Sequence, residues 1–437
     1  MTSTISGEIQ FGIFFHGVNF TTIWHWPESG DQIDFESFRR FAQTAERGKF
    51  AAFFLGEGLR LREHLGRLHD LDVVGRPDAQ TAEAALAAVT TRLGLVATQS
   101  TTYNDPADLA YRLASLNHLS QGRNAWNIVT THNAWTGENF RRGGYVSYED
   151  RYRHADSFVT AVKEIWRAGE RGEPGLRYRD DFYDLDVRRT LPLVPGGRPV
   201  LFQAGDSPSG RDFAVRHADI IFSAHPEFGD ATAFAADIEQ RALRAGRAPG
   251  SVRPFPGSTF VVADSEKEAQ DKWYEVRRAQ ITPQTAVAYL EQFWGRELQD
   301  FDPDGPLPDV DPVITDADVT RGSGFQANNT RKLIDAWRGQ ARDRGWSIRE
   351  FVINHTNRGN DTNGFVGTPS SIADSLQRYA ETGIVAGFNI SPYLTPVGLD
   401  EIVNLLVPEL QDRGIYPREY AGTTLREHLG LSEEVPG

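Results

Sequence analysis

The sequence of 437 residues contains no cysteine. Disulfides, cysteine-ligated zinc, iron–sulfur clusters and a thiol nucleophile are therefore excluded. The sequence also lacks any run of roughly 18 apolar residues, the length of a membrane-spanning helix. Its first residues, MTSTISGEIQ, have neither the basic nor the apolar region of a signal peptide. These absences are typical of a protein that works in a reducing cytoplasm, and we expect a cytoplasmic location.

Basic residues are outnumbered, with 46 Lys and Arg against 60 Asp and Glu and a net charge of -14. A chain of this charge repels the phosphates of nucleic acid, and we expect neither nucleic acid nor a membrane as a partner. Hydrophobic residues make up 39% and charged residues 24%, as in a soluble globular protein with a large core. Because no Pro/Gly/Ser-rich linker divides the chain, we expect one domain over residues 1–437.

Short apolar segments alternate with stretches of helical periodicity, which is typical of β–α units around a parallel sheet. Several segments are continuously apolar, as expected for strands that are covered on both faces. Eight such strands predict an α/β fold, a (β/α)8 TIM barrel. We expect them at Ile9–His16, Phe50–Gly56, Arg92–Ser100, Asn124–Thr130, Pro199–Gly205, Asp219–Ala224, Ser258–Asp264 and Val385–Ser391.

Several helix starts are predicted by N-cap residues. Asp34 can cap one helix, and Asp105 and Thr368 each precede a proline at the first helical position. Ser147, with Asp150 three residues later, resembles a capping box. The helix after Asp34 is expected to bury one face, made of Phe35, Phe38, Phe41 and Ala45.

One stretch interrupts the barrel pattern. Residues Ile281–Arg344 contain FDPDGPLPDVDP and TRGSGFQANNT, and the stretch is too long for an ordinary barrel loop. We interpret it as an insertion after the seventh strand that acts as a lid over the barrel mouth. The alternative is a surface decoration without function.

In a TIM barrel the functional side chains lie at the C-terminal ends of the strands. Three histidines, His16, His132 and His225, lie at or just after the ends of predicted strands, but no HxH or HExxH spacing supports a metal site, and we expect none. Glu57 and Asp206 are the obvious acidic residues there, a weak basis for a paired-carboxylate glycosidase. A serine hydrolase is disfavoured because the sequence has no GxSxG elbow.

The segment QAGDSPSGRDFAVRHAD carries the clearest physical signal. A strand ends at Gly205, a polar turn follows, and a helix begins near Pro208. The hydroxyls of Ser207 and Ser209, free backbone N–H groups and the Arg211 side chain are expected to face one point, as in a phosphate site at a helix N-terminus. The alternative is that Ser207 is only an N-cap. The residues alone leave both interpretations open.

The chain resembles, nearly end to end, the nitrilotriacetate and dibenzothiophene-sulfone monooxygenase family of the bacterial-luciferase-like superfamily. The resemblance rests on ERGKFAAFFLGEGL, LGLVATQSTTYNDPADLAYRLASLNHLSQGRNAWNIVT, YEDRYRHADSFVTAVKEIW, PVLFQAGDSPSGRDFAVRHAD, LQDFDPDGPLP, GFVGTPSSIADSL and LQDRGIYPREYAGTTLREHLGL. It implies a TIM barrel that uses reduced FMN and O2, through a C4a-peroxyflavin, to oxygenate a small organic substrate. It also implies a separate NAD(P)H-dependent flavin reductase that supplies reduced FMN by diffusion, and a homodimer or homotetramer.

The resemblance also implies site residues. Flavin contacts carried over by position are Glu57, Thr98, Tyr148, Tyr152 and Ser207. Tyr148 stands where the family often has histidine, and Glu57 where it usually has aspartate. Asn127 and Arg211 are further cofactor-binding candidates. His16 is the catalytic candidate because some relatives place a pocket histidine on the first strand, and the alternative is a pocket-wall residue.

Aromatic residues gather around the first strand and favour a flat, apolar or aromatic heterocyclic substrate; they are Phe14, Phe15, Phe20, Trp24 and Trp26. No Arg/Lys cluster is evident beside them, which weakens a polycarboxylate substrate. Two alternatives to the oxygenase stay open. One is a deazaflavin- or flavin-dependent oxidoreductase of the same superfamily, and the other is a flavin-binding protein without turnover.

Overall fold

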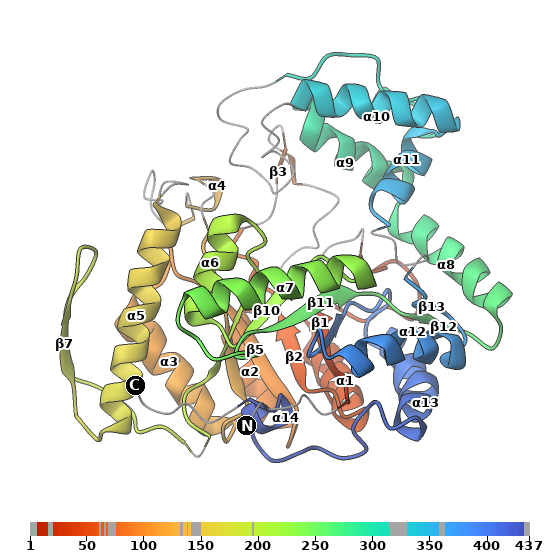
Figure 1. The fold of residues 1–437 in the computed structure, drawn as a ribbon. Coiled ribbons are helices and arrows are strands. Elements are labelled where there is room, and N and C mark those ends of the chain that lie inside the picture. The colour runs from red at the N-terminus through yellow and green to blue at the C-terminus, as the bar shows by residue number, and fades with distance from the viewer. Residues whose placement is uncertain are drawn as a thin grey trace.

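A computed structural model describes residues 7–15, 21–60, 63–64, 67–68, 76–131, 134–137, 139–140, 150–194, 196–313, 330–357 and 363–431. Eight parallel strands close into a barrel in the order β1-β14-β11-β10-β9-β6-β5-β2, seen near the centre of Figure 1. They are β1 (Gln10–Phe15), β2 (Ala52–Leu55), β5 (Gly94–Ser100), β6 (Asn124–Val129), β9 (Val200–Gln203), β10 (Ile220–Ser223), β11 (Arg253–Ser258) and β14 (Gly387–Ile390). The prediction of a (β/α)8 TIM barrel is confirmed.

The seventh barrel strand was predicted at Ser258–Asp264, and this position is wrong. The barrel strand is β11, which precedes that segment, and Val261–Val262 forms β12 in a separate two-stranded sheet with β13 (Val366–Gly367). The sequence of β11, RPFPGS, has two prolines and a glycine, which usually indicate a turn. The Pro254 carbonyl accepts a hydrogen bond from Ala386 N on the β14 side, so the strand uses its carbonyls there although Pro254 has no N–H group.

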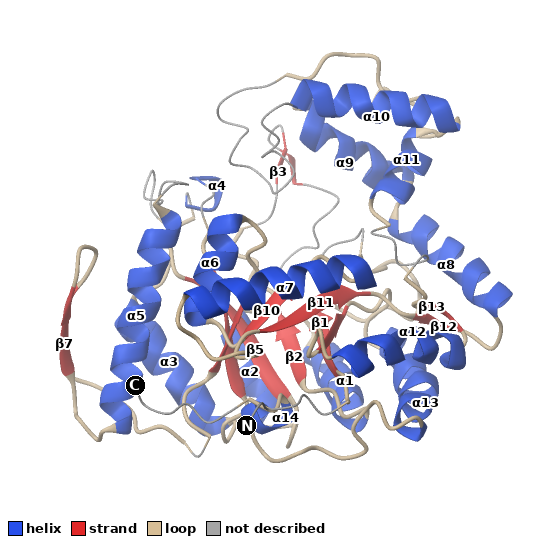
Figure 2. Cartoon of the chain, viewed as in Figure 1, coloured by secondary structure: helices blue, strands red, loops and turns tan. Residues whose placement is uncertain are grey.

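Helices surround the barrel (Figure 2). They are α1 (Phe35–Arg47), α2 (Ala79–Ala87), α3 (Pro106–Leu119), α4 (Ala134–Gly137), α5 (Arg151–Glu170), α6 (Pro208–His217), α7 (Phe228–Arg244), α8 (Glu266–Gln280), α12 (Pro369–Thr382), α13 (Val407–Asp412) and α14 (Leu425–His428), with the short helices η3 (Val397–Leu399) and η4 (Ile402–Leu406). Two-residue strands β3 (Glu63–His64) and β4 (Arg67–Leu68) pair with each other, as do β7 (Leu176–Arg179) and β8 (Asp184–Val187).

Side-chain caps explain where several helices start. Asp34, Asp105 and Thr368 accept hydrogen bonds from backbone N–H groups of the first turns of α1, α3 and α12, as predicted. The described part of α5 begins at Arg151, with Asp150 before it, and the predicted cap Ser147 lies outside the described residues. Phe35 is 39% exposed and not part of the buried face of α1, since it occupies the first position of the helix.

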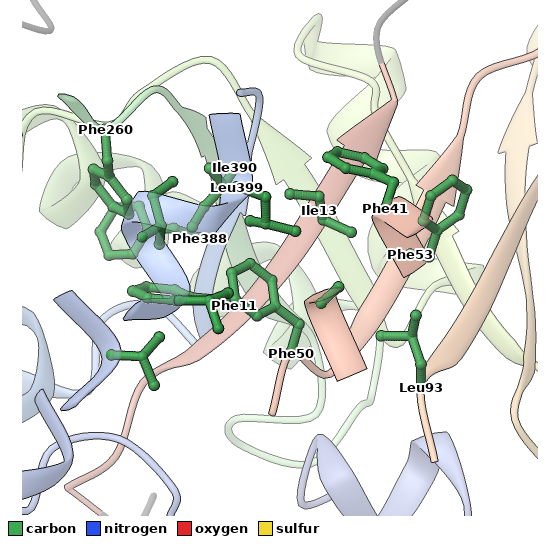
Figure 3. Close-up of a cluster of buried hydrophobic side chains, with 14 of the residues drawn as sticks. Phe11, Ile13, Phe41, Phe50, Phe53, Leu93, Phe260, Phe388, Ile390 and Leu399 are labelled. Atoms are coloured by element: carbon green, nitrogen blue, oxygen red, sulfur yellow. The ribbon is translucent and has the colours of Figure 1, made fainter. Parts of the chain in front are cut away.

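The main core lies between the barrel and its helices. Figure 3 shows part of it, where Phe11 of β1 and Phe388 of β14 pack with Phe50 and Phe260. Inside the barrel a second cluster contains Phe54, Phe202 and Phe255. Leu425 and Leu429 of the C-terminal segment belong to this inner cluster and are almost fully buried. The chain end therefore contributes directly to the packing of the barrel.

Three helices that follow α8 form a unit with a core of its own. They are α9 (Pro283–Trp294), α10 (Thr330–Arg344) and α11 (Ile348–His355), grouped beyond α8 in Figure 1. Their shared core includes Trp294, Trp337 and Phe351. The unit extends past Arg344, because α11 packs against α9. None of the helices in the described ranges combines the length and apolar character needed to cross a bilayer.

Candidate active site

A cavity of about 430 Å³ lies at the C-terminal ends of the barrel strands. This is the end at which TIM-barrel enzymes carry their active sites. All eight strands or their first following residues contribute side chains to its lining: Phe14 (β1), Phe54 (β2), Thr98 (β5), Asn127 (β6), Ala204 after β9, Phe222 (β10), Ser258 (β11) and Asn389 (β14). The aromatic rings pack edge to face, with centroids 4.7 Å apart for Phe14 and Phe54 and 4.6 Å apart for Phe54 and Phe222.

Thr98 and Asn127 sit side by side on adjacent strands. Their register pairs the two residues, and Asn127 Nδ2 donates a hydrogen bond to Thr98 Oγ1 over 3.0 Å. The Asn127 Oδ1 atom is buried and has no hydrogen-bond partner among the described residues. Since an unsatisfied buried acceptor is costly, this oxygen is well suited to accept a hydrogen bond from a ligand N–H group. The structure thus brings these two predicted residues together.

Glu57 follows β2 and lines the same cavity. The pKa of its carboxyl group is raised to about 8. Burial is the main cause and the nearby charge of Asp78 adds to it, while a backbone hydrogen bond at Ser100 and the charge of Arg112 act in the opposite direction. The Oε2 atom is buried and lacks a hydrogen-bond partner within the described part of the chain. At neutral pH the Glu57 side chain is therefore mainly a neutral carboxylic acid that can donate a hydrogen bond.

The start of α6 forms the predicted polar turn. Ser207 is the N-cap, and its Oγ accepts a hydrogen bond from Gly210 N over 3.1 Å. A Cβ atom at Gly210 would lie 2.8 Å from the Tyr152 hydroxyl oxygen and 2.9 Å from the Cα of Gly205, so glycine is needed for this close approach. The Arg151 guanidinium lies over the Tyr152 ring at 4.5 Å. Tyr152 and Ser207 are therefore neighbours at the N-terminus of α6.

Ser207 is the N-cap of α6, as the alternative interpretation predicted, and the same turn can also bind an anion. Its Oγ serves as an acceptor within the turn, while the hydroxyl hydrogen stays able to donate. The helix macrodipole adds partial positive charge at the same point. The two interpretations that the sequence left open are thus compatible in the structure.

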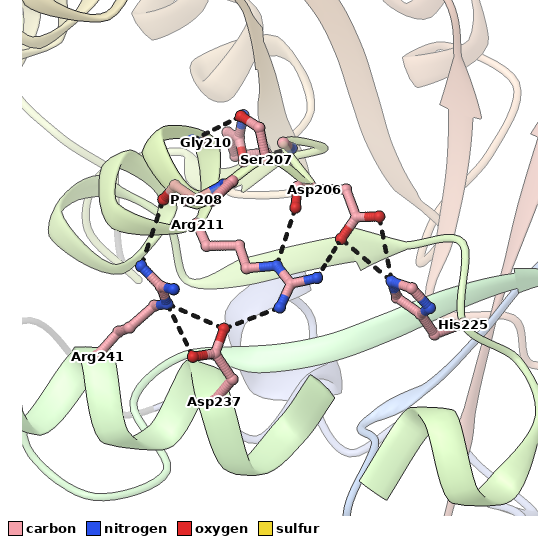
Figure 4. A network of polar contacts seen from close by, with 10 residues as sticks. Asp206, Ser207, Pro208, Gly210, Arg211, His225, Asp237 and Arg241 are labelled. Atoms are coloured by element: carbon pink, nitrogen blue, oxygen red, sulfur yellow. Dashed lines mark hydrogen bonds and ion pairs between the residues drawn. The ribbon is translucent and has the colours of Figure 1, made fainter. Parts of the chain in front are cut away.

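Arg211 has a different environment from the predicted one (Figure 4). Its guanidinium donates hydrogen bonds to the carboxylates of Asp206, over 2.8 Å, and Asp237, over 2.9 Å. His225 Nε2 also lies 3.1 Å from the Asp206 carboxylate. Burial raises the pKa of Asp206, but the hydrogen bonds from Arg211 and His225 outweigh it and hold this pKa below its ordinary value. These contacts direct Arg211 to protein carboxylates and give no support to its predicted role at a ligand phosphate.

One wall of the cavity was missed by the sequence analysis. Trp273, Arg277 and Gln280 of α8 line it, together with Thr21 and with Thr356 at the end of α11. The three α8 residues are four and three positions apart, the spacing that places side chains on one helix face. That spacing was a usable signal, but α8 was not recognised as bordering the site.

The aromatic residues near β1 divide between site and core. Phe14 lines the cavity, whereas Phe15 is fully buried and stacks on Phe38 with centroids 4.4 Å apart. Trp24 and Trp26 pack against hydrophobic clusters and do not line the cavity. Four residues named from the sequence for the site or its surroundings lie outside the described residues; they are His16, Phe20, His132 and Tyr148.

Comparison with protein families identifies the chain. Residues 10–386 match the model of luciferase-like monooxygenases. The chain belongs to this family. The resemblance inferred from the sequence motifs is confirmed, and with it the assignment as a flavin-dependent monooxygenase.

Individual relatives agree with the family over nearly the whole chain. Nitrilotriacetate monooxygenase component A of Aminobacter aminovorans is 34% identical, over 94% of this chain and 93% of the relative. Dibenzothiophene-sulfone monooxygenase of Rhodococcus erythropolis is 34% identical, over 93% and 92% of the two chains. The crystal structure of a riboflavin lyase with modified FMN and riboflavin superposes with a TM-score of 0.75 at 29% identity, covering 97% of this chain and 96% of that one.

The cavity has features that fit a flavin. Its aromatic side chains, Phe14, Phe54 and Phe222, suit a flat ring system. The Asn127 Oδ1 and Glu57 Oε2 atoms lack hydrogen-bond partners within the described residues, and they match the donors and acceptors along an isoalloxazine edge. The N-terminus of α6 adds a place for a phosphate.

Proposed function

We propose that the chain is the oxygenase component of a two-component monooxygenase and uses reduced FMN and O2 to oxygenate a small organic substrate. The observation that carries this proposal is a cavity formed by all eight strand ends, with an unsatisfied amide oxygen on one side and the α6 helix N-terminus nearby in the same barrel mouth. Family membership supports it. When bound, reduced flavin supplies the electrons that activate O2.

The proposed roles of the cavity residues follow from their chemistry. Asn127 and Thr98 would orient the polar edge of the flavin ring, and Asn127 would gain the hydrogen bond it lacks. Glu57 would hold its proton at the carboxyl oxygen and donate it as a hydrogen bond. Ser207 and Tyr152 would contact the phosphate at the start of α6. Tyr148 and Arg211 stay predictions from the family resemblance and the sequence.

We propose further that the Ile281–Arg344 insertion serves as a lid. Residues of α8 and Thr356 line the cavity, so the chain on either side of α9 and α10 borders the site. A lid would exclude bulk water, which favours transfer of oxygen to the substrate over loss as hydrogen peroxide. His16 is proposed as a group that steers protonation at the site.

Partners and location follow the same reasoning. We propose that a separate NAD(P)H-dependent reductase supplies the reduced FMN by diffusion, that the protein is cytoplasmic, and that it forms a homodimer or homotetramer. The substrate is proposed to have an apolar or aromatic body, because aromatic rings of Phe14, Phe54 and Phe222 line the cavity. Dibenzothiophene sulfone, for which one relative is named, has such a body.

An oxygen electrode tests the proposal. The purified protein is combined with a flavin reductase, NADH, FMN and a panel of sulfur and nitrogen heterocycles and small organic acids. We expect at least one compound to be converted to an oxygenated product in proportion to the oxygen consumed. Binding of reduced FMN without any oxygenated product across the panel would favour a flavin-binding protein or an oxygen-independent oxidoreductase instead.

A further inference from the structure

Asn389 of β14 lines the cavity and is not among the residues proposed to hold flavin. Phe388 and Ile390, its neighbours in the chain, belong to the main core between the barrel and its helices (Figure 3). Because side chains alternate along a strand, the Asn389 amide points into the barrel. It is 5% exposed, and no hydrogen bond joins its amide to another described residue. The amide therefore offers a donor and an acceptor to a ligand in the cavity.

Glycines flank Asn389 on both neighbouring strands. In the register of the barrel it pairs with Gly12 of β1 and with Gly257 of β11. A Cβ atom at Gly12 would lie 3.1 Å from Asn389 Oδ1 and 3.0 Å from the Phe255 ring. At Gly257 the nearest atoms to such a Cβ are backbone oxygens 3.9 Å and 4.0 Å away, so there is open space beside the amide. The two glycines thus leave a niche next to Asn389 that a ligand group can enter.

The polar side chains on this side of the cavity are neutral. Thr259 and Ser391, the first residues after β11 and β14, line the cavity beyond the niche, and Thr259 Oγ1 donates a hydrogen bond to the Ser391 carbonyl over 3.0 Å. The charged residues of the described lining come from other elements; they are Glu57, Asp206 and Arg277. A neutral polar group can enter the niche at a smaller desolvation cost than an ion, and an amide matches both the donor and the acceptor of Asn389.

β14 lies across the barrel from the strand that carries Asn127. In the closed barrel β6 is four strands from β14 in either direction, through β11, β10 and β9 or through β1, β2 and β5. Asn127, with Thr98 on the adjacent strand, is proposed to hold the polar edge of the flavin ring. A group bound at Asn389 is therefore on the opposite side of the cavity from that edge, where the substrate can bind.

We propose that Asn389 selects the substrate by pairing with a neutral amide group. The Asn389 Oδ1 atom accepts a hydrogen bond from the substrate N–H, and Nδ2 donates one to the substrate carbonyl. A primary carboxamide or a lactam presents its N–H and C=O on the same side, so one amide makes both hydrogen bonds. The proposal rests on the proposed function, since it assigns this side of the cavity to the substrate. It specifies the substrate class as a carboxamide or lactam with an apolar or aromatic body.

Matched pairs of probes test this inference directly. Benzamide is compared with acetophenone, and phenylacetamide with phenylacetone, by isothermal titration calorimetry on the full-length protein with excess FMN. Each methyl ketone has nearly the shape of its amide and lacks the N–H donors, so it leaves the buried Asn389 oxygen without a partner. The amides should bind roughly five- to a hundred-fold more tightly than the ketones. Equal affinities, no saturable binding of either amide, or tighter binding of benzoate than of benzamide would overturn the inference.

Three variants assign the preference to Asn389. Asn389→Leu, which is close to asparagine in size, should make the affinities for amide and ketone equal and leave the affinity for FMN unchanged. Asn127→Leu is the matched control on the opposite strand: it should weaken FMN and, at saturating FMN, keep the preference for amides. Gly257→Val leaves Asn389 in place, fills the niche and should weaken amide and ketone alike.

Two results with these variants would contradict the inference. One is a preference for amides that persists in Asn389→Leu, or a wild-type affinity for amides in Gly257→Val. The other is a loss of FMN affinity in an Asn389→Leu protein that is folded by circular dichroism, because Asn389 would then contact the flavin.

Oxygen consumption with a flavin reductase, NADH and FMN separates this inference from the proposed function. If reduced FMN supports oxygenation and amides are not preferred over ketones, only the inference fails. If amides are preferred in calorimetry and no compound is oxygenated, the proposed function fails and the amide site stands.

Discussion

Replacing Glu57 by glutamine tests the chemical state of the cavity. Glutamine has the size of a protonated glutamic acid and cannot ionise. In the wild type the Glu57 carboxyl has a pKa of about 8 against an ordinary value of 4.5, chiefly because burial penalises the charged form. The folded protein therefore keeps this proton between pH 4.5 and pH 8, whereas the unfolded chain has released it.

The size and sign of the effect follow from proton linkage. Because the folded state binds more protons in this window, the free energy of unfolding of the wild type decreases as pH rises, by at most about 1.4 kcal/mol per pH unit. The whole shift of Glu57 corresponds to an upper limit of about 5 kcal/mol at pH 8 and above. The Glu57 side chain is partly exposed, so the actual loss of unfolding free energy is smaller than this limit. The Glu57→Gln variant does not lose this unfolding free energy as pH rises, because glutamine does not ionise.

The assay is denaturant unfolding of both proteins at pH values from 5 to 9. We expect the variant to become progressively more stable than the wild type as pH rises, with the difference levelling off near pH 8. Glu83 is fully buried on α2 and also has a raised pKa, but its contribution is the same in both proteins and cancels in the difference. Parallel stability curves for the two proteins would show that Glu57 is ionised in the folded state and would refute the reasoning.

Three other predictions concern the cofactor, the insertion and His16. Reduced FMN should bind roughly ten- to a hundred-fold more tightly than reduced riboflavin in an anaerobic titration, and Ser207→Ala should weaken FMN more than riboflavin; equal affinities would remove the phosphate assignment. Hydrogen exchange in α9 and α10 should slow when FMN and substrate bind, whereas unchanged exchange would favour a surface decoration. His16→Ala, and His16→Asn, which is closer to histidine in size, should keep the affinity for FMN. The product formed per oxygen consumed should fall, because the proton-transfer step slows by ~10²–10⁴-fold. An unchanged ratio of product to oxygen would make His16 a wall residue.

The barrel strands were predictable where burial on both faces requires a continuous run of apolar residues in the sequence. Strand β2, with the sequence AFFL, is buried along its whole length and is therefore continuously apolar. β11 escaped prediction because Pro254 and Pro256 resemble a turn, and only its neighbours in the closed barrel reveal the strand. Tertiary context overrode local propensity there.

The site was predictable to the extent that strand ends converge in a barrel. Thr98, Asn127 and Glu57 follow from strand position, and the structure brings them into one cavity. Arg277 is about 180 residues beyond Thr98 in sequence. The spacing of Trp273, Arg277 and Gln280 indicates one helix face, but that this face borders the cavity depends on how α8 packs. The contact of Arg211 with Asp237 could not be predicted from the local sequence, because Asp237 lies on another helix, α7.

The origin of the oxygen atom in the product tests the central claim most directly. The protein, a flavin reductase, NADH, FMN and a converted substrate are incubated under isotopically labelled O2, and the product is analysed by mass spectrometry. A flavin-dependent monooxygenase predicts one labelled oxygen atom in each product molecule and none when FMN is omitted. An unlabelled product, or a product that forms equally without FMN, would contradict the account.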